Sequence, residues 1–207
     1  VPDRPHEHQA TQHLSLRQLL RRRELLLFLT ACMLMQASHG AYYAFYSIFL
    51  ESAGYREMSI GMLWALGVAI EVLVFLRMHR LLERFGARRL ILASLALAAL
   101  RWLMIGFFVE IVALQILAQT LHAASFGVFH AAAIHLTHQY FPGPTQGRGQ
   151  ALYNSLSFGV GGAIGSLISG MLWSSAGPGW TFSVAAGFAA LGLAAAYWSR
   201  NPDTVEA

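Results

Sequence analysis

Residues 63–76 read LWALGVAIEVLVFL, an apolar run interrupted by a single carboxylate, Glu71. The run extends back to Ile60, and residues 60–76 are long enough to cross the hydrocarbon core of a bilayer, about 30 Å thick, as an α-helix. A charged side chain near the centre of a bilayer costs at least about 2.5–3.5 kcal/mol. Glu71 therefore needs a partner, a water-filled cavity or a bound proton.

Six long apolar runs dominate the 207-residue chain. Hydrophobic residues make up 56% of it and charged residues 12%, about half of the roughly 25% that a soluble domain carries. Backbone polar groups in lipid are satisfied only in helices and closed barrels, and these runs are too long and too continuously apolar for barrel strands. We therefore predict an all-α membrane protein with six transmembrane helices. The predicted parts are a polar linker at 1–24, a transmembrane domain at 25–200 with spans at 25–50, 60–76, 90–108, 111–135, 151–173 and 180–198, and a tail at 201–207.

All 14 basic residues are arginine, and the predicted spans sort them by side. Five precede the first span, five lie between spans two and three, one lies between spans four and five, and one follows span six. The other side receives only Arg56, while Arg101 lies inside span three. By the positive-inside rule both termini are cytoplasmic, and we expect an integral protein of the bacterial cytoplasmic (inner) membrane. Arginines beside spans face anionic headgroups, so the expected partner is the lipid bilayer and not nucleic acid.

The loop after span two, HRLLERFGARRL at residues 79–90, has the residues of a tight interhelical turn. Gly86 permits a positive φ, and the arginines can cap helix C-termini and pair with Glu83. The loop also resembles the signature loop of the major facilitator superfamily, which is a glycine, three residues, Asp-Arg, any residue and Gly-Arg-Arg. Four positions match, Glu83, Arg84, Gly86 and Arg88, whereas the first glycine and one arginine are replaced.

Three further stretches resemble the phenylpropionate-permease branch of this superfamily, a relative of lactose permease and the nucleoside symporters. They are HGAYYAFYSIFLESAGY (39–55), LHAASFGVFHAA (121–132) and FPGPTQGRGQALYNS (141–155). A twelve-helix facilitator has two six-helix halves, each built from two three-helix inverted repeats. The resemblance implies that this chain is the C-terminal half, helices seven to twelve. It also implies proton-coupled symport of a small organic solute, such as an aromatic carboxylate, by alternating access, together with the missing N-terminal half or a second copy.

Four ionisable side chains within the spans are candidates for proton coupling: Glu71, Arg101, His122 and His130. At about 1.5 Å per residue from the cytoplasmic ends, Glu71 lies roughly 9–12 Å deep, His130 roughly 12 Å, Arg101 roughly 18 Å and His122 roughly 24 Å. Glu71 is thus nearest in height to His130. We predict a ladder of these four residues rather than one closed pair, because a carboxylate beside a movable cation can bind and release a proton. The alternative is that Glu71 and Arg101 only lock helices together.

The resemblance to lactose permease implies a similar network, since that transporter uses a carboxylate on helix eight, an arginine on helix nine and a histidine on helix ten. Arg101 and His122 look similar to that arginine and histidine. Ser125 stands where the proton-carrying glutamate belongs, and Gln119 where a lysine does. If protons drive transport, Glu71, a histidine or a group in the other half must carry them.

Two stripes of polar and aromatic residues, on spans one and four, follow helical periodicity. Their members are Gln36, His39, Tyr43 and Tyr46, and Gln115, Gln119, His122, Phe126 and Phe129. With Asn154 on span five, we predict that they line a substrate cavity, because aromatic walls with a few polar groups suit an amphipathic organic ligand. Arg101 or a protonated histidine could receive its carboxylate. The alternative is helix packing, with Tyr42 and Tyr46 in an interfacial aromatic belt.

Span five is rich in glycine. Gly161 and Gly165 form a small-xxx-small pair, which lets helix backbones approach closely. We expect this pair to be principally structural.

Other functions have less support. The chain contains neither the G-x-S-G nor the H-E-x-x-H pattern of intramembrane proteases, so we expect no enzyme. His130, His135 and His138 are scattered around their helix, and we expect no metal and no cofactor. A non-transporting membrane scaffold or receptor is the alternative function.

Overall fold

The computed structural model describes residues 21–199. The predicted tail, and the predicted linker up to residue 20, lie outside these residues. The described part is helical and contains no strand. Its helices are α2 (Arg23–Ser52), α3 (Glu57–Phe75), α4 (Met78–Phe85), α5 (Ala87–Phe107), α6 (Val112–His122), α7 (Val128–Tyr140), α8 (Gln146–Asn154), α9 (Gly162–Ser175) and α10 (Pro178–Trp198), with π-helical turns η1 (Ala123–Gly127) and η3 (Ser155–Gly161) and a 3-10 turn η2 (Gly143–Thr145).

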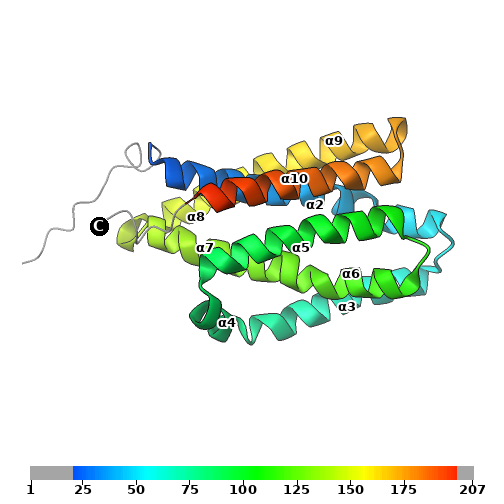
Figure 1. The fold of residues 1–207 in the computed structure, drawn as a ribbon, viewed down its shortest axis with the longest axis horizontal. Coiled ribbons are helices and arrows are strands. Elements are labelled where there is room, and N and C mark those ends of the chain that lie inside the picture. Colours follow the sequence, from blue (N-terminus) through cyan, green and yellow to red (C-terminus); the bar gives the residue numbers. More distant parts are fainter. Residues whose placement is uncertain (1–20, 200–207) are drawn as a thin grey trace, which may run out of the picture.

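Within residues 21–199, six helical segments run from one end of the molecule to the other (Figure 1). Each is long and apolar enough to cross a membrane and overlaps one of the apolar runs. The fourth is continuous through α6, η1 and α7, and the fifth runs from η2 through α9. Three segments precede the α5–α6 connection and three follow it, so the second triplet begins at the opposite end from the first (Figure 1). The predicted all-α, six-helix membrane fold is confirmed.

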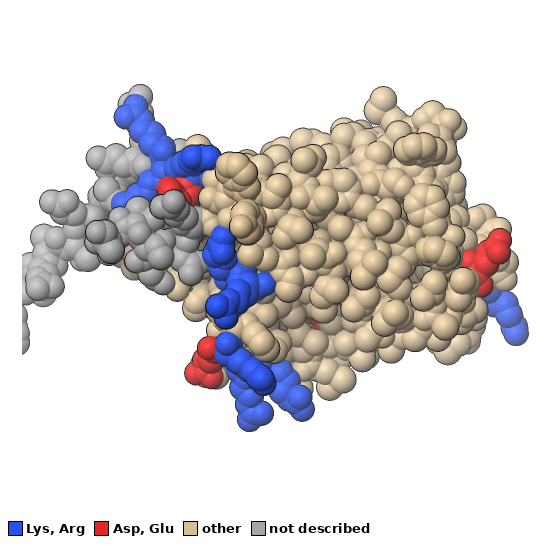
Figure 2. Space-filling view, in the orientation of Figure 1, with Lys and Arg blue, Asp and Glu red and all other residues tan. Residues whose placement is uncertain are grey.

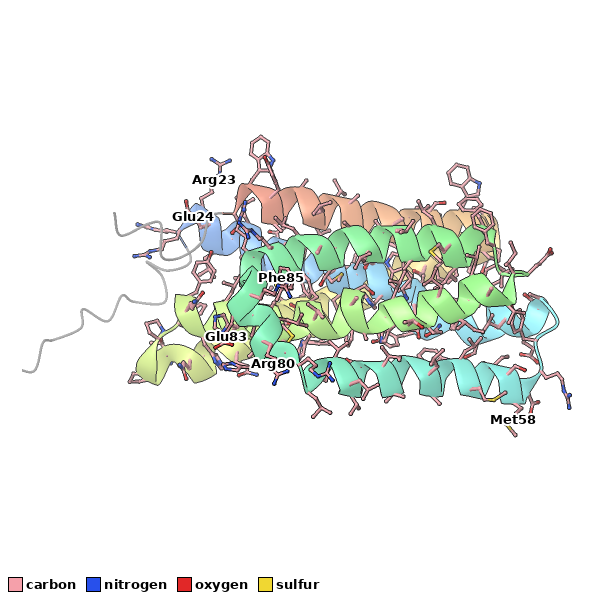
Figure 3. The ribbon with its side chains drawn as sticks, turned by 60° about the horizontal axis from the view of Figure 1, so that its bottom comes forward. Arg23, Glu24, Met58, Arg80, Glu83 and Phe85 are labelled. Atoms are coloured by element: carbon pink, nitrogen blue, oxygen red, sulfur yellow. The ribbon has the colours of Figure 1, made fainter. Side chains whose placement is uncertain are left out.

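Arginine side chains gather at the end of the bundle where α2 begins and α10 ends (Figure 2). Arg80 and Glu83 of α4 lie toward the same end as Arg23 and Glu24 of α2, whereas Met58 lies at the opposite end (Figure 3). We call the first the arginine-rich end. Its described arginines are Arg21, Arg22, Arg23, Arg77, Arg80, Arg84, Arg88, Arg89 and Arg148.

The helix α2 is the most enclosed of the six spans and packs against α10, α9 and η3. Its approach to the fifth span is so close that a Cβ at Gly161 would collide with the Met33 carbonyl, and one at Gly165 with the Ala37 carbonyl. Both glycines therefore let the two backbones touch, as the small-xxx-small pattern predicted. Gly40 of α2 faces Gly165 in the same way.

The signature-like loop forms the short helix α4 and a sharp turn. Gly86 has a φ of 75°, the left-handed conformation expected of it. Glu83 pairs with His79, whose Nε2 lies 3.2 Å from Oε1, which corrects the expectation of an arginine partner. The spacing of four residues along α4 explains the pairing, because such side chains are neighbours on one helix face.

Arg88 fastens the start of α5 to the end of α10. Its Nε donates to the Ser199 carbonyl over 3.0 Å, and its Nη2 to the Tyr197 carbonyl over 2.6 Å. The Ser199 hydroxyl donates in turn to the Glu24 carbonyl over 3.0 Å. Arg88 thus caps orphan carbonyls at a helix C-terminus, the role predicted for arginines of this loop.

The π-helical turn η1 changes which residues share a face of the fourth span. In η1 the Val128 amide donates to the Ala123 carbonyl, five residues back. A π-turn inserts a residue into the helix. The ring stripe therefore continues from His122 through Phe126 to His130, with ring planes 9° and then 6° apart. Phe129, the predicted continuation, makes no ring contact within residues 21–199 and lies in the apolar core, so the stripe does not continue through it.

Candidate functional site

Arg101 of α5 is fully buried, with 0% of its surface exposed. Its guanidinium carbon lies 4.3 Å from the ring centroid of Tyr42 on α2 and 4.3 Å from that of the adjacent Trp102. None of its three guanidinium nitrogens makes a well-aligned hydrogen bond within residues 21–199, although the Tyr42 hydroxyl is close enough to interact with the guanidinium. The two rings hold the charge by cation–π attraction, and no carboxylate of residues 21–199 lies within ion-pair distance of it.

Residues around Arg101 also carry buried polar atoms for which the described part of the chain provides no partner: His39 Nε2, Trp102 Nε1, Gln119 Nε2 and His122 Nδ1. Ring contacts bring them together, because His39 lies 4.8 Å from Trp102 and 6.1 Å from His122. An unsatisfied buried polar group costs about 1–3 kcal/mol. Guanidinium, indole and amide N–H groups are donors, so a group with several acceptor oxygens would satisfy those of Arg101, Trp102 and Gln119. His39 Nε2 is instead an acceptor, because Nδ1 of the same ring donates to the Met35 carbonyl over 2.9 Å.

Glu71 of α3 lies against the fourth span. Its Oε2 is 3.8 Å from His122 Nε2, within ion-pair distance if the imidazole is protonated. Its side chain passes over Gly127, where an added Cβ would lie 2.9 Å from Glu71 Cγ. One turn earlier, a Cβ at Gly67 would lie 3.1 Å from Gln119 Oε1. Glycines on both helices thus allow α3 to approach α6 and η1 closely.

The height estimate is wrong in one respect, because Glu71 lies beside His122 and not beside His130. Counting residues from the cytoplasmic helix ends assumes that the second and fourth spans end at the same height. In the structure α7 extends past the end of α3 toward the arginine-rich end (Figure 1). Equal counts from the two helix ends therefore do not give equal heights.

His130 forms a separate contact group nearer the arginine-rich end. Its Nδ1 lies 2.8 Å from the Tyr153 hydroxyl, and its ring lies 5.5 Å from that of Phe158. The Phe126 ring separates it from His122, at 6.2 Å from His130 and 5.2 Å from His122. Of the four predicted coupling residues, Glu71, Arg101 and His122 therefore belong to one group. The Phe126 ring separates this group from His130.

The predicted cavity residues divide into buried and exposed ones. Gln115 and Gln119 are buried, and their Oε1 atoms accept hydrogen bonds from the Tyr46 hydroxyl (3.2 Å) and the Tyr42 hydroxyl (2.8 Å), respectively. Tyr43 is 49% exposed, with its ring 6.2 Å from that of Phe126. Of the other predicted cavity residues, Gln36 and His39 are buried, and Asn154 is exposed on the bundle surface.

Sequence reasoning missed Tyr42 and Trp102 as members of the site. Tyr42 and Tyr46 are buried at 1% and 0% exposure, so neither belongs to an interfacial belt. The ring of Trp64 lies 4.6 Å from that of Tyr42, so α3 also contributes an aromatic ring to this group. One signal was available, because Tyr42 follows His39 by three residues and so lies on the same helix face as the predicted stripe.

Comparisons with known proteins find a family and a relative to which this chain is similar. The MFS_1 like family matches residues 2–184 of the chain. The probable 3-phenylpropionic acid transporter of Escherichia coli (strain K12) is 34% identical over 165 residues, which cover 77% of this chain and 42% of that relative. The chain therefore spans less than half the length of the curated relative that it matches.

Proposed function

The chain belongs to the MFS_1 like family of the major facilitator superfamily, and on this premise we propose that it forms one six-helix half of a secondary active transporter. The proposed substrate is a small aromatic carboxylate, and the proposed coupling ion is the proton. The observation that carries the proposal is the fully buried Arg101, which makes no ion pair and no well-aligned hydrogen bond within residues 21–199. Because a buried cation without a counter-ion is costly, a substrate anion is its natural partner.

Two features favour a carboxylate that carries an aromatic ring. A guanidinium binds a carboxylate with two parallel hydrogen bonds. The Arg101 guanidinium lies against the rings of Tyr42 and Trp102, and the Trp64 ring packs in turn on Tyr42. Tyr43 and Phe126 are only partly covered, so their rings are available to an apolar group of a ligand. The E. coli relative is named for 3-phenylpropionic acid, which has both a phenyl ring and a carboxylate.

Glu71 and His122 are the proposed coupling pair. A carboxylate accepts or loses a proton according to its burial and the charges near it, and Glu71 has His122 at 3.8 Å. Arg101 belongs to the same group, because the Tyr42 ring lies 4.3 Å from its guanidinium and 5.4 Å from the His122 ring. A substrate carboxylate that neutralises Arg101 would therefore change the electrostatic field at Glu71.

Transport by alternating access requires a second six-helix half, which would be an N-terminal half or a second copy of this chain. The spans with the least buried surface are α3 and the segment from η2 to α9. These are the faces with which the second half would enclose the substrate. We further propose that the arginine-rich end is cytoplasmic, by the positive-inside rule, and that the membrane is the bacterial inner membrane.

Counterflow in proteoliposomes that contain this chain together with the second half tests the proposal. Vesicles preloaded with unlabelled 3-phenylpropionate should take up the radiolabelled acid transiently, and an inward proton gradient should drive its accumulation. The neutral 3-phenylpropionamide, which has the same ring and length, should compete poorly because it offers Arg101 no negative charge. Absence of counterflow for every carboxylate tried would instead favour a scaffold or receptor.

A further inference from the structure

The Glu71 side chain packs against the fourth span at a single glycine, Gly127. We call this contact the Glu71 seat. An added Cβ at Gly127 would lie 2.9 Å from Glu71 Cγ, 3.2 Å from Oε1 and 3.4 Å from Cδ. Contacts shorter than 3.0 Å to a Cβ are essentially never seen, so any side chain at position 127 would require Glu71 to move. The absence of a side chain is therefore what lets the Glu71 side chain lie flat on the helix.

The π-turn brings this glycine to the face that α3 contacts. His122 and Gly127 are five residues apart, and both lie against Glu71. In an α-helix residues five apart are about 500° apart, or 140° after a full turn, so they would not share a face. The i to i+5 hydrogen bond of η1 widens the turn and aligns them. Such π-turns occur frequently at functional sites.

We propose that Gly127, presented by the π-turn η1, is a positioning residue that holds the Glu71 carboxyl beside His122. This inference rests on the proposed coupling role of Glu71 and His122. A methyl group at position 127 displaces the carboxyl from the helix surface and separates it from His122 Nε2. Displacement uncouples the protonation of Glu71 from the substrate site, although the substrate groups around Arg101 stay in place.

The first test measures the position of the carboxyl without any transport. A hydrophobic carbodiimide reacts with protonated carboxyls in membranes, and peptide mass spectrometry reports the rate at Glu71 itself. Gly127→Ala should raise this rate several-fold, because the displaced carboxyl is no longer covered by η1. The matched control is Gly187→Ala, an exposed glycine of α10, where an added Cβ meets no described atom within 4 Å. Its labelling rate at Glu71 should equal that of the parent.

The second test measures coupling in the complete transporter. Gly127→Ala should abolish accumulation driven by a proton gradient but keep 3-phenylpropionate counterflow within about twofold, and Gly187→Ala should keep both. A glycine needed only for packing would lower accumulation and counterflow together, so the split between the two readouts identifies the positioning role. Combining Gly127→Ala with Glu71→Gln should cause no further loss beyond that of Glu71→Gln.

The outcomes separate this inference from the proposed function. Unchanged labelling of Glu71 in Gly127→Ala, or equal changes in Gly127→Ala and Gly187→Ala, overturns the positioning role. Faster labelling in Gly127→Ala would support the positioning role of Gly127. If Glu71→Gln nevertheless accumulated substrate normally, the proposed role of Glu71 in proton coupling would be wrong. Normal accumulation by Gly127→Ala when Glu71→Gln has lost it shows that the seat is not needed for coupling, and overturns the inference alone.

Discussion

The guanidinium of Arg101 lies over the ring of Tyr42, with its central carbon 4.3 Å from the ring centroid. The contact joins α5 to α2 in a place that water does not reach, since both residues are at most 1% exposed. Cation–π attraction is worth about 2 kcal/mol or more when the partners are desolvated. It therefore offsets part of the cost of the buried charge without occupying the N–H groups that a carboxylate would need.

Arg101→Ala should weaken acidic substrates much more than neutral ones. The loss of a buried charge-assisted pair corresponds to about 2–5 kcal/mol, or roughly 30-fold or more in the KM for 3-phenylpropionate counterflow. Competition by 3-phenylpropionamide should change much less, since the amide makes no ion pair. Equal losses for the acid and the amide would mean that Arg101 serves the structure alone.

The Tyr42 ring and its hydroxyl can be tested separately. Tyr42→Phe keeps the ring over Arg101 and removes the hydrogen bond to Gln119 Oε1, which is worth about 0.5–1.5 kcal/mol. Tyr42→Leu removes the ring itself and should raise the KM for 3-phenylpropionate by about tenfold more than Tyr42→Phe does, because the cation loses its aromatic face. Similar kinetics in the two variants would exclude a role for the cation–π contact.

Glu71→Gln should abolish proton-driven accumulation of 3-phenylpropionate and spare its exchange. The amide has nearly the same shape as the carboxyl and still fits over Gly127, but it cannot take up a proton. Accumulation against a gradient and counterflow are measured in the same proteoliposome preparation. A mutant that still accumulates substrate uphill would show that another group carries the proton.

The sequence predicts those parts of this fold that depend on local pattern. The length of the apolar runs predicts six membrane helices, the glycine spacing predicts a close helix–helix approach by the fifth span, and Gly86 predicts the sharp turn after α4. Each of these depends on residues that are close together in the chain, or on a requirement that lipid imposes on any chain.

The parts that could not be predicted depend on the relative placement of different helices. Because of the π-turn in the fourth span, the ring stripe continues through His130 and not through Phe129. A π-turn is defined by its backbone hydrogen bond, and no residue type in the sequence marks it. Because α7 extends past the end of α3, Glu71 lies at the height of His122, and the two side chains are 3.8 Å apart. Tyr42 could be identified as a partner of Arg101 only when α5 and α2 were seen to pack together, because 59 positions separate the two residues in the chain.

Arg88 and Arg89 are adjacent arginines with different surroundings, and they give a matched pair for stability. Arg88 donates to two carbonyls at the C-terminus of α10, whereas Arg89 is exposed. Arg88→Gln should therefore lower the free energy of unfolding by about 1–2 kcal/mol, because it removes charged hydrogen bonds and a cation at a helix C-terminus. In a chain of this size the melting temperature in detergent should fall by roughly 2–8 °C. Arg89→Gln should leave it unchanged, and an equal fall in both variants would mean that net charge, and not the cap on α10, sets the stability of this end.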